Sequence, residues 1–257
     1  MNDIELIFPI NTAASLYRPE HFGKSPFPCN DSPKTCILNM YPFLFEYTKI
    51  LSKSSEFKLL TNILLNVKFL CTDSLLFIFN TFGASFTGLI MELCIHWGCE
   101  NFYLFGSAGI MNPVIESGSL ILPDQIIRDE GTSFHYSNPS RMIRVNPILS
   151  ERFSQYLTKK RLPYHRGLHW TTDAPFRETP LKVKRLQEEG CISVDMEASA
   201  VIAIADHYKK NCMAVLTGLD HLDYKGWTAV INRKEVIDII KNHYQSLIHF
   251  INSEMHS

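Results

Sequence analysis

The chain has 257 residues, of which 46% are hydrophobic, and its formal net charge is −1. This length and apolar content suit one compact domain with a full core, although length alone also allows two smaller domains. We expect a single domain over residues 1–257. The near-neutral charge argues against association driven by the charge of a nucleic acid, so no nucleic-acid partner is expected.

The cysteine pattern indicates a reducing compartment. The seven cysteines are odd in number and form no CxxC pair or Cys/His cluster, so we expect no metal. Most lie in apolar segments, where free cysteine behaves as a small buried hydrophobe. The first ten residues lack the features of a signal peptide, and the longest apolar stretches are too short or too polar to span a bilayer. We therefore expect a cytoplasmic protein with no membrane partner.

The N-terminal part of the chain predicts two strands, a long loop and a helix. Residues 4–10 form a short apolar run that we expect to be the first strand. Residues 11–33 contain four prolines together with Gly and Asn and predict a long loop, a type of segment that often carries function. Residues 35–41 predict the next strand. A helical segment follows, with apolar residues at Phe43, Phe45, Ile50 and Leu51.

The middle of the chain predicts strands on both sides of a helix. Residues 67–71 and 75–79 predict two strands around a Thr-Asp-Ser turn. Gly83 is the expected turn before a helix over residues 84–97, which Gly98 would end. The segment 101–105 predicts a strand.

The C-terminal half continues this alternation, which favours an α/β fold with a mostly parallel or mixed sheet. In such folds, small molecules bind at the carboxyl ends of the strands. We expect strands at residues 119–127, 165–171, 192–195 and 212–218, and helices at residues 180–189, 196–208 and 234–251.

A run of small residues follows the strand predicted at 101–105. Gly106, Ser107, Ala108 and Gly109 would let backbone amides approach a ligand, and the Ser107 hydroxyl suits a phosphate, a nucleophilic water or a ribose oxygen. The run has neither the spacing of a dinucleotide fingerprint nor the lysine of a P-loop. It is equally consistent with a tight turn that packs against a neighbour.

Met196 and Glu197 open the helix predicted at 196–208. The two carboxylate oxygens of Glu197 suit the vicinal hydroxyls of a sugar, and Met196 would give that sugar an apolar wall. The alternative is that Glu197 simply interacts favourably with the helix dipole from the first turn.

Asp220 and His221 follow the strand predicted at 212–218. A carboxyl group at the end of a buried strand can have its pKa raised by desolvation and can then donate a proton near neutral pH. The alternative is an aspartate that caps a loop. His221 either packs or orients its neighbour.

The polar loop after the strand predicted at 165–171 holds an aromatic side chain, an arginine and two acids. Phe176 suits stacking on a planar base, and Arg177 suits a hydrogen bond to a carbonyl or a phosphate. The alternative is a capped turn in which Asp173 bonds loop amides while Arg177 and Glu178 form a solvated pair.

The segment 128–136 is also polar and follows a predicted strand. It either closes one side of the same site or forms a surface loop that turns at Gly131, and the sequence does not favour one over the other.

Six segments occur in a consistent order between Gly83 and about Asp223. They read FGASFTGLIMELCIHWG, FYLFGSAGIMNPVIESGSLILP, RDEGTSFHY, TTDAPFRET, VDMEASAV and LTGLDH. Together they resemble the superfamily of nucleoside phosphorylases and nucleosidases, which includes purine nucleoside phosphorylases, uridine phosphorylases and methylthioadenosine nucleosidases. Each segment is weak alone, but six in the right order make a specific signal.

The resemblance implies a fold and a set of site residues. The fold would be a single-domain, three-layer α/β/α arrangement around a mixed, partly barrel-like sheet. Glu197 and Met196 would bind ribose, Asp220 would protonate a purine ring, and Ser107 would lie near phosphate or the attacking water. Further substrate-binding residues would be Gly106, Ala108, Thr172, Asp173, Phe176 and Arg177, of which the last two would line the base pocket.

The reaction implied is cleavage of the N-glycosidic bond of a nucleoside, through an oxocarbenium-like sugar. A purine substrate is expected because uridine-specific members lack the acid found at Asp220. A well-placed acid is worth about a hundred- to ten-thousand-fold in rate. Phosphate, the family's typical acceptor, or water would attack the anomeric carbon. No cofactor is implied beyond phosphate as a co-substrate, and the expected assembly is a homo-oligomer, either a dimer or a trimer of dimers.

Departures from the family pattern bear on the acceptor and the base. Phosphorylases usually carry an early Gly-Asp-Pro-x-Arg loop, whereas residues 9–22 read PINTAASLYRPEHF, and Leu104 stands where they commonly have an arginine. A phosphate dianion is poorly bound without an arginine, so water is the alternative acceptor, unless Arg18 or a neighbouring subunit supplies the cation. Asp195 replaces a common Glu, and Pro175 a common aromatic beside the base.

A third hypothesis is a nucleoside-binding protein that no longer turns over its ligand. The presence of both Glu197 and Asp220 argues against it, because a protein that only binds needs no acid to protonate a leaving base.

Overall fold

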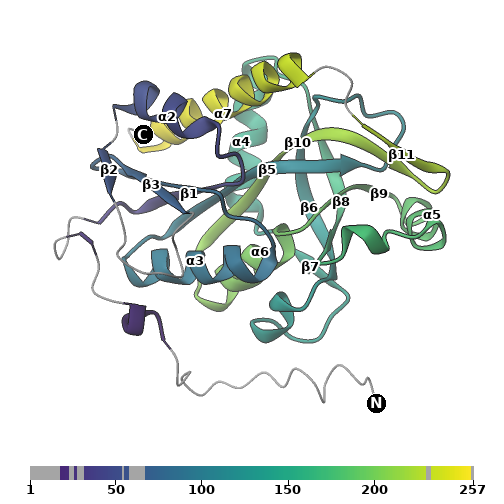
Figure 1. Cartoon of the computed structure of the whole chain (residues 1–257), viewed down its shortest axis with the longest axis horizontal. Helices are drawn as coiled ribbons and strands as arrows, with labels where there is room; N and C mark the ends of the chain where they lie inside the picture. Colours follow the sequence, from purple (N-terminus) through teal and green to yellow (C-terminus); the bar gives the residue numbers. More distant parts are fainter. Residues whose placement is uncertain are drawn as a thin grey trace.

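Five strands close on themselves at the centre of the fold (Figure 1). The computed structural model describes residues 18–22, 26–27, 32–53, 55–57, 67–229 and 233–255. Within them, β9 pairs with both β8 and β5, so the ring has no open edge. The ring contains both parallel and antiparallel strand pairs, which confirms the mixed, partly barrel-like sheet. The ring consists of β5 (Asn101–Ile110), β10 (Asn211–Asp223), β6 (Leu120–Asp129), β8 (Tyr164–Thr172) and β9 (Cys191–Asp195).

An open arm of the sheet extends from β5. The strand β1 (Thr35–Asn39) pairs in parallel with both β5 and β4 (Leu75–Phe79). Beyond β4, the antiparallel strands β3 (Lys68–Cys71) and β2 (Ser55–Phe57) complete the arm. Two short described strands pair with strands of the ring. The strand β7 (Met142–Arg144) pairs with β6, and β11 (Gly226–Thr228) forms a hairpin with the end of β10.

Side-chain alternation along β5 explains the three layers. Phe102 and Leu104 point into one apolar cluster, which α3 (Ala84–His96) and α6 (Ala198–His207) cover. Tyr103 and Phe105 point into the other, because successive side chains of a strand face opposite sides. That second face is covered by α2 (Leu44–Ser52), α4 (Pro147–Lys159) and α7 (Arg233–Met255).

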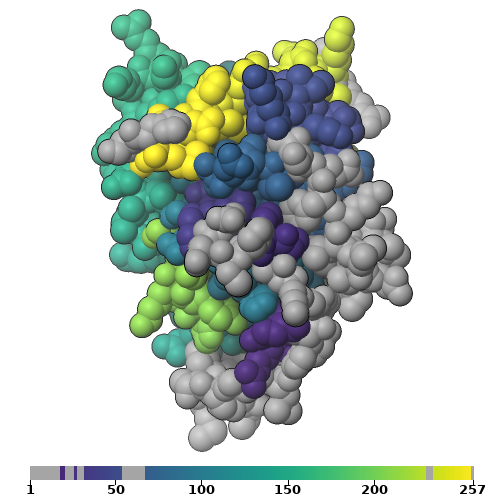
Figure 2. All heavy atoms as spheres, turned by 90° about the vertical axis from the view of Figure 1, so that its left-hand side faces the viewer, coloured from purple at the N-terminus to yellow at the C-terminus, as the bar shows by residue number. Residues whose placement is uncertain are grey.

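The two helical layers lie on opposite sides of the sheet, with α2, α4 and α7 on one side and α3 and α6 on the other (Figure 1). Figure 2 shows α2 beside α7 on the face away from the β10–β11 hairpin, where Thr48 donates a hydrogen bond to the buried Tyr244 hydroxyl at 3.0 Å. The predicted α/β/α layering is therefore confirmed. Among the described helices, none combines the length and the apolar character needed to cross a bilayer.

A smaller apolar cluster holds α5 (Pro180–Glu188) against the ring. Its Val183 and Leu186 pack near the fully buried Trp170 of β8 and near Leu222 of β10. The described residues also include three short 3₁₀ helices: η1 (Pro19–Phe22), η3 (Thr132–His135) and η4 (Pro175–Arg177).

Two strands, β5 and β10, extend five residues past the ends that the sequence predicted. The small residues 106–109 are not a turn but the second half of β5, paired with β10 and β9. Glycine suits this strand because other side chains cross above it: a Cβ at Gly106 would overlap the Met40 thioether, and one at Gly109 would lie 3.1 Å from Val194. In the same way, β10 continues through Asp220 to Asp223 instead of ending at residue 218.

Other differences concern the ends of the chain and one helix. The sequence did not predict α4, which begins where the Asn146 side chain accepts the Ile148 N–H at 3.1 Å. The helix after β9 begins at Ala198, so Glu197 is its N-cap residue and not part of its first turn. The strand predicted at residues 4–10 and most of the loop predicted at 11–33 lie outside the described residues.

Candidate active site

A cavity of about 580 Å³ opens between β5, β9, β10 and the loop after β8. A volume of this order suits a small organic ligand. Its walls come from distant parts of the chain, which the closed ring brings together. The lining residues are Met40, Phe82, Ser107, Ala108, Gly109, Pro175, Phe176, Glu178, Val194, Asp195, Met196, Glu197, Asp220, Leu222 and Trp227.

Glu197 is fully buried, and half of its carboxyl group has no protein partner. Its Oε1 accepts the Gly83 N–H at 2.6 Å, a contact that the positive φ of Gly83 (82°) makes possible. Its Oε2 is buried without a hydrogen bond among the described residues. Burial and the negative charge of Asp195 raise the Glu197 pKa to about 8, although the Gly83 and Met196 amides oppose this shift. A buried, unpaired acceptor on a cavity wall is a place for a donor from a ligand.

Glu197 is the N-cap residue of α6, but the side chain that bonds the first turn of the helix is that of Asp195. Its Oδ2 accepts the Ala198 N–H at 2.8 Å, and its Oδ1 accepts the Thr171 hydroxyl at 2.6 Å. The His169 Nε2 is 2.9 Å from the same Oδ1, at an angle that does not make a hydrogen bond. The other ring nitrogen of His169 lies 2.7 Å from the Ser193 hydroxyl. Asp195 is thus held on two sides by its own neighbours, and it supports the wall beside Glu197.

Asp220 reaches the same cavity from β10. The pairing of β10 with β5 shifts its register between Gly218 and His221, and Asp220 lies in this irregular stretch. Its Oδ2 accepts the Trp227 indole N–H at 2.6 Å, across the hairpin. Contrary to the prediction, Asp220 is therefore within a strand and not after it. His221 pairs with Thr228 and lines a separate cavity.

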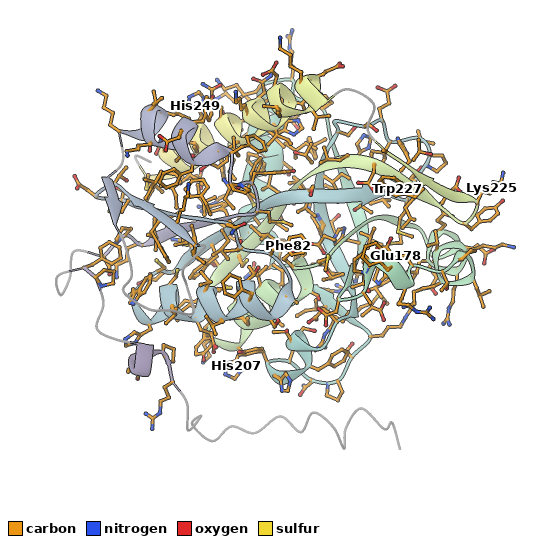
Figure 3. The ribbon with its side chains drawn as sticks, viewed as in Figure 1. Phe82, Glu178, His207, Lys225, Trp227 and His249 are labelled. Carbon is orange, nitrogen blue, oxygen red and sulfur yellow. The ribbon has the colours of Figure 1, made fainter. Side chains whose placement is uncertain are left out.

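Glu178 is a cavity residue that the sequence reasoning missed. It follows η4, is half-buried, and faces the cavity, so the alternative of a solvated pair with Arg177 is not what the structure has. Burial and the charge of Asp220 raise the Glu178 pKa to about 7, while Lys182 opposes the shift. Figure 3 shows Glu178 on the same side of the molecule as Trp227. No local sequence signal identifies it, because its importance comes from a neighbour 42 positions away.

An uncharged cluster surrounds Ser107. Ser107 of β5 is in register with Thr217 of β10, and the Thr217 hydroxyl lies 3.0 Å from His243 Nδ1. Burial lowers the His243 pKa to about 4, so its ring is neutral. Burial raises the pKa of Tyr41, and the nearby hydroxyls of Ser107 and Thr217 oppose this, although none bonds the Tyr41 hydroxyl directly. Ser107 therefore has hydroxyls and a neutral imidazole around it.

A residue that the sequence did not single out lies over Gly106, next to Ser107. Met40, which follows β1, lines the cavity and packs over Gly106. Residues 9–22, which the family pattern placed here, lie mostly outside the described residues, and Arg18 does not line the cavity. Leu104, at the usual arginine position, is fully buried in the core with α3 and α6. Among the described residues that line the cavity, none is lysine or arginine.

The structure brings six of the ten predicted site residues to this cavity: Ser107, Ala108, Phe176, Met196, Glu197 and Asp220. Phe176 is fully exposed at its mouth.

The other four predicted site residues lie elsewhere. Gly106 lies beneath Met40, and Arg177 is exposed outside the cavity. The Thr172 hydroxyl accepts the Ala174 N–H at 3.3 Å, and Asp173 accepts the Gly131 N–H at 2.9 Å. Thr172 and Asp173 therefore shape the loop and do not line the cavity.

The segment 128–136 does not line the cavity either. The buried Arg128 bonds Ser133 at 2.8 Å, and Glu130 accepts the Ser199 hydroxyl of α6 at 2.8 Å. It is a packed connection, neither a wall of the cavity nor an open surface loop.

Comparison with known proteins supports one family. The model of the Phosphorylase superfamily matches residues 64–248. A DeoD-type purine nucleoside phosphorylase of Brevibacillus brevis is 26% identical over 132 residues, 51% of this chain and 56% of that protein. One of Bacillus cereus is 37% identical over 141 residues, 52% and 57% of the two chains. The chain spans about half the length of the curated relatives it matches.

Two solved structures resemble the whole fold. Purine nucleoside phosphorylase from Toxoplasma gondii has a TM-score of 0.73 at 15% identity, covering 86% of this chain and 90% of that one. The 5′-methylthioadenosine/S-adenosylhomocysteine nucleosidase of Campylobacter jejuni has a TM-score of 0.71 at 18% identity, with 86% and 100% covered. At these identities the likeness establishes the fold.

Proposed function

Because the chain belongs to the phosphorylase superfamily, we propose that it cleaves the N-glycosidic bond of a purine nucleoside in the cavity shared by Glu197 and Asp220. The observation that carries the proposal is the Glu197 carboxyl group. One of its oxygens is fixed by the Gly83 N–H, and the other is buried, unpaired and on the cavity wall.

The sugar would bind beside Glu197. Its vicinal hydroxyls would donate hydrogen bonds to Oε2 and thereby favour the ionised carboxylate, while Met196 packs against the sugar ring. The negative charge then stabilises the positive charge that develops on the sugar as the C1′–N bond breaks. Burial makes this interaction strong, because little water screens it.

The base would lie between Phe176 and Asp220. Phe176 offers a ring face to the purine, and Asp220 supplies the proton that the base takes up with the electrons of the broken bond. The proton gained by the base equals the proton lost by the attacking water, so hydrolysis balances without any other reactant.

We propose water as the acceptor. The surroundings of Ser107 support this choice, because they hold hydroxyls and a neutral imidazole, and no described cavity residue is cationic. A phosphate dianion in such a site would be desolvated without a compensating charge, whereas a water molecule needs only hydrogen-bond partners. Phosphorolysis is the second candidate, in which Arg18 or a neighbouring subunit would supply the cation.

The acceptor prediction is tested by assaying adenosine and inosine with and without phosphate. We expect base release at the same rate in both conditions, with free ribose as the sugar product. Reaction in ¹⁸O-labelled water should place the label on the oxygen bonded to C1′ of the ribose product. Base release that requires phosphate and yields ribose 1-phosphate would establish phosphorolysis instead. Release of no base from either nucleoside, with both bound, would favour a protein that only binds its ligand.

We also propose a homo-oligomer, either a dimer or a trimer of dimers. The exposed aromatic side chains at the cavity mouth support it, because Phe176 is 100%, Trp227 63% and Phe82 62% exposed, and clustered exposed apolar groups are typical of interaction sites. Sedimentation velocity should give a species at least twice the chain mass of 29.5 kDa. A stable monomer at micromolar concentration would contradict the proposal.

A further inference from the structure

Two carboxyl groups from different elements face the side of the cavity where the base would lie. Glu178 follows η4, and Asp220 lies in the irregular stretch of β10; both line the cavity. Asp220 has one oxygen engaged by the Trp227 indole. The Glu178 carboxyl accepts no hydrogen bond from the described residues, so it is free to meet a ligand. Figure 3 shows Glu178 and Trp227 extending from their two elements on this side of the molecule.

The two groups act on each other electrostatically. Burial and the Asp220 charge raise the Glu178 pKa to about 7. Among the described residues, the cation that opposes this shift is Lys182, and its ammonium is already bonded to Asp129 at 2.8 Å. Two carboxyl groups in one partly buried site resist ionising together. At and below about pH 7 the pair therefore shares one proton, which Glu178 holds while the cavity is empty, and this leaves one carboxylic acid and one carboxylate.

The other charged groups on and near the hairpin do not change the number of protons that Glu178 and Asp220 hold. The Asp223 carboxylate accepts the backbone N–H groups of Lys225 and Gly226, and Lys184 and Lys225 lie over the Tyr224 ring, 5.9 Å and 5.5 Å from its centroid. Asp223, Lys184 and Lys225 are absent from the cavity lining.

An acid beside a carboxylate matches one kind of purine edge. A 6-aminopurine presents the N7 acceptor next to an amino donor, whereas a 6-oxopurine presents two acceptors, N7 and O6. An acid and a carboxylate satisfy the first edge completely. The second edge would place O6 against the carboxylate unless the pair held a second proton.

We propose that Glu178 and Asp220 together read this edge and select a 6-aminopurine nucleoside, a proposal that rests on the function given above. When the base is bound, the shared proton passes through Asp220 to N7 of the leaving base, and Glu178, then ionised, accepts a hydrogen bond from the 6-amino group. Glu178 is thus the residue that determines specificity.

The test compares kcat/KM for adenosine and inosine at pH 7 in the native chain and in Glu178→Gln. Both nucleosides carry the same ribose, so effects at Glu197 cancel in the ratio. We expect the native chain to favour adenosine by about tenfold or more, the cost of leaving O6 against an acceptor. In Glu178→Gln the ratio should fall to within about threefold, because an amide both donates and accepts. Glu188→Gln, on the exposed end of α5, is the matched control and should keep the native ratio.

A second measurement follows the ratio in the native chain as pH falls from 7 to 5. The preference for adenosine over inosine should become smaller, because added protons let the pair donate to O6 as well. This arm decides the proposal even if Glu178→Gln does not fold. A native preference for inosine, or a ratio that neither the substitution nor pH alters, overturns it.

The same two nucleosides separate this inference from the proposed function. If neither is cleaved, the proposed function fails, and the ratio is then measured as dissociation constants by calorimetry. Tighter binding of adenosine that depends on Glu178 would still support the selection of a 6-aminopurine by Glu178 and Asp220. Equal or undetectable binding of the two nucleosides would overturn that reading as well.

Discussion

Replacing Glu197 with glutamine is expected to lower kcat/KM by about a hundred- to a thousandfold, the usual cost of losing a group that stabilises charge in the transition state. The amide keeps an oxygen for the Gly83 N–H but carries no negative charge to oppose the positive sugar. Steady-state assay of base release is the measurement, with Glu188→Gln as control. Activity within tenfold of the native chain would remove Glu197 from the mechanism.

The same substitution is expected to stabilise the folded chain. The Glu197 pKa is raised from 4.5 to about 8 on folding, so below pH 4.5 the carboxyl is neutral in both states and burial of its charge costs nothing. Between pH 4.5 and about 8, Glu197 loses its proton in the unfolded chain but keeps it in the folded chain. The free energy of unfolding therefore falls as the pH rises to about 8. Glutamine avoids this cost, which is on the order of 2–4 kcal/mol.

Thermal unfolding at pH 5 and at pH 8 measures this effect. The melting temperature of Glu197→Gln should exceed that of the native chain by roughly 5–10 °C at pH 8, and by much less at pH 5. A variant less stable than the native chain at pH 8 would mean that the carboxylate is satisfied in the folded state. A gain in stability together with a loss of turnover is the pattern expected of an active-site charge.

Asp220→Asn is expected to lower kcat/KM for purine nucleosides by about a hundred- to ten-thousandfold, because the base must then leave without its proton. The loss should depend on the leaving group. A p-nitrophenyl riboside, whose phenolate departs without protonation, should lose less than about tenfold. This contrast is informative because a variant that merely disturbs the cavity would slow both substrates equally.

The matched control for Asp220 is Trp227→Phe, which keeps the aromatic ring and removes the N–H that bonds Oδ2 at 2.6 Å. It should cost about three- to tenfold, the value of one ordinary hydrogen bond. Equal losses for both substrates in Asp220→Asn would assign Asp220 to binding or folding instead of proton transfer.

Periodicity predicted most of the elements, because the strands and helices around the ring are strongly apolar. It misplaced their ends where glycine occurs for a packing reason. The run at residues 106–109 resembles a turn in sequence, but its small residues keep β5 extended beneath Met40 and Val194. A glycine that avoids a side chain and one that allows a turn look the same until the neighbour is known.

The cavity was less accessible to prediction than the fold. Family motifs led to Glu197 and Asp220, which line one cavity. Glu178 was given no site role, and its only suggested contact was the alternative of a solvated pair with Arg177, because Asp220 lines the same cavity only in the folded chain. Tyr41 was assigned to a strand, and its position near Ser107 depends on β1 pairing with β5. Contacts of this kind follow from the closed ring and not from local sequence.

The bond between the Trp227 indole and Oδ2 of Asp220 has a further consequence. It makes the two oxygens of one carboxyl group unequal: Oδ2 is engaged as an acceptor, so the proton that the proposed reaction takes from Asp220 must leave from Oδ1. In the proposed reaction, the direction from which the purine would receive its proton is therefore set by an indole that is 63% exposed on a three-residue strand. A side chain on the surface of the molecule would thus orient the acid inside the cavity.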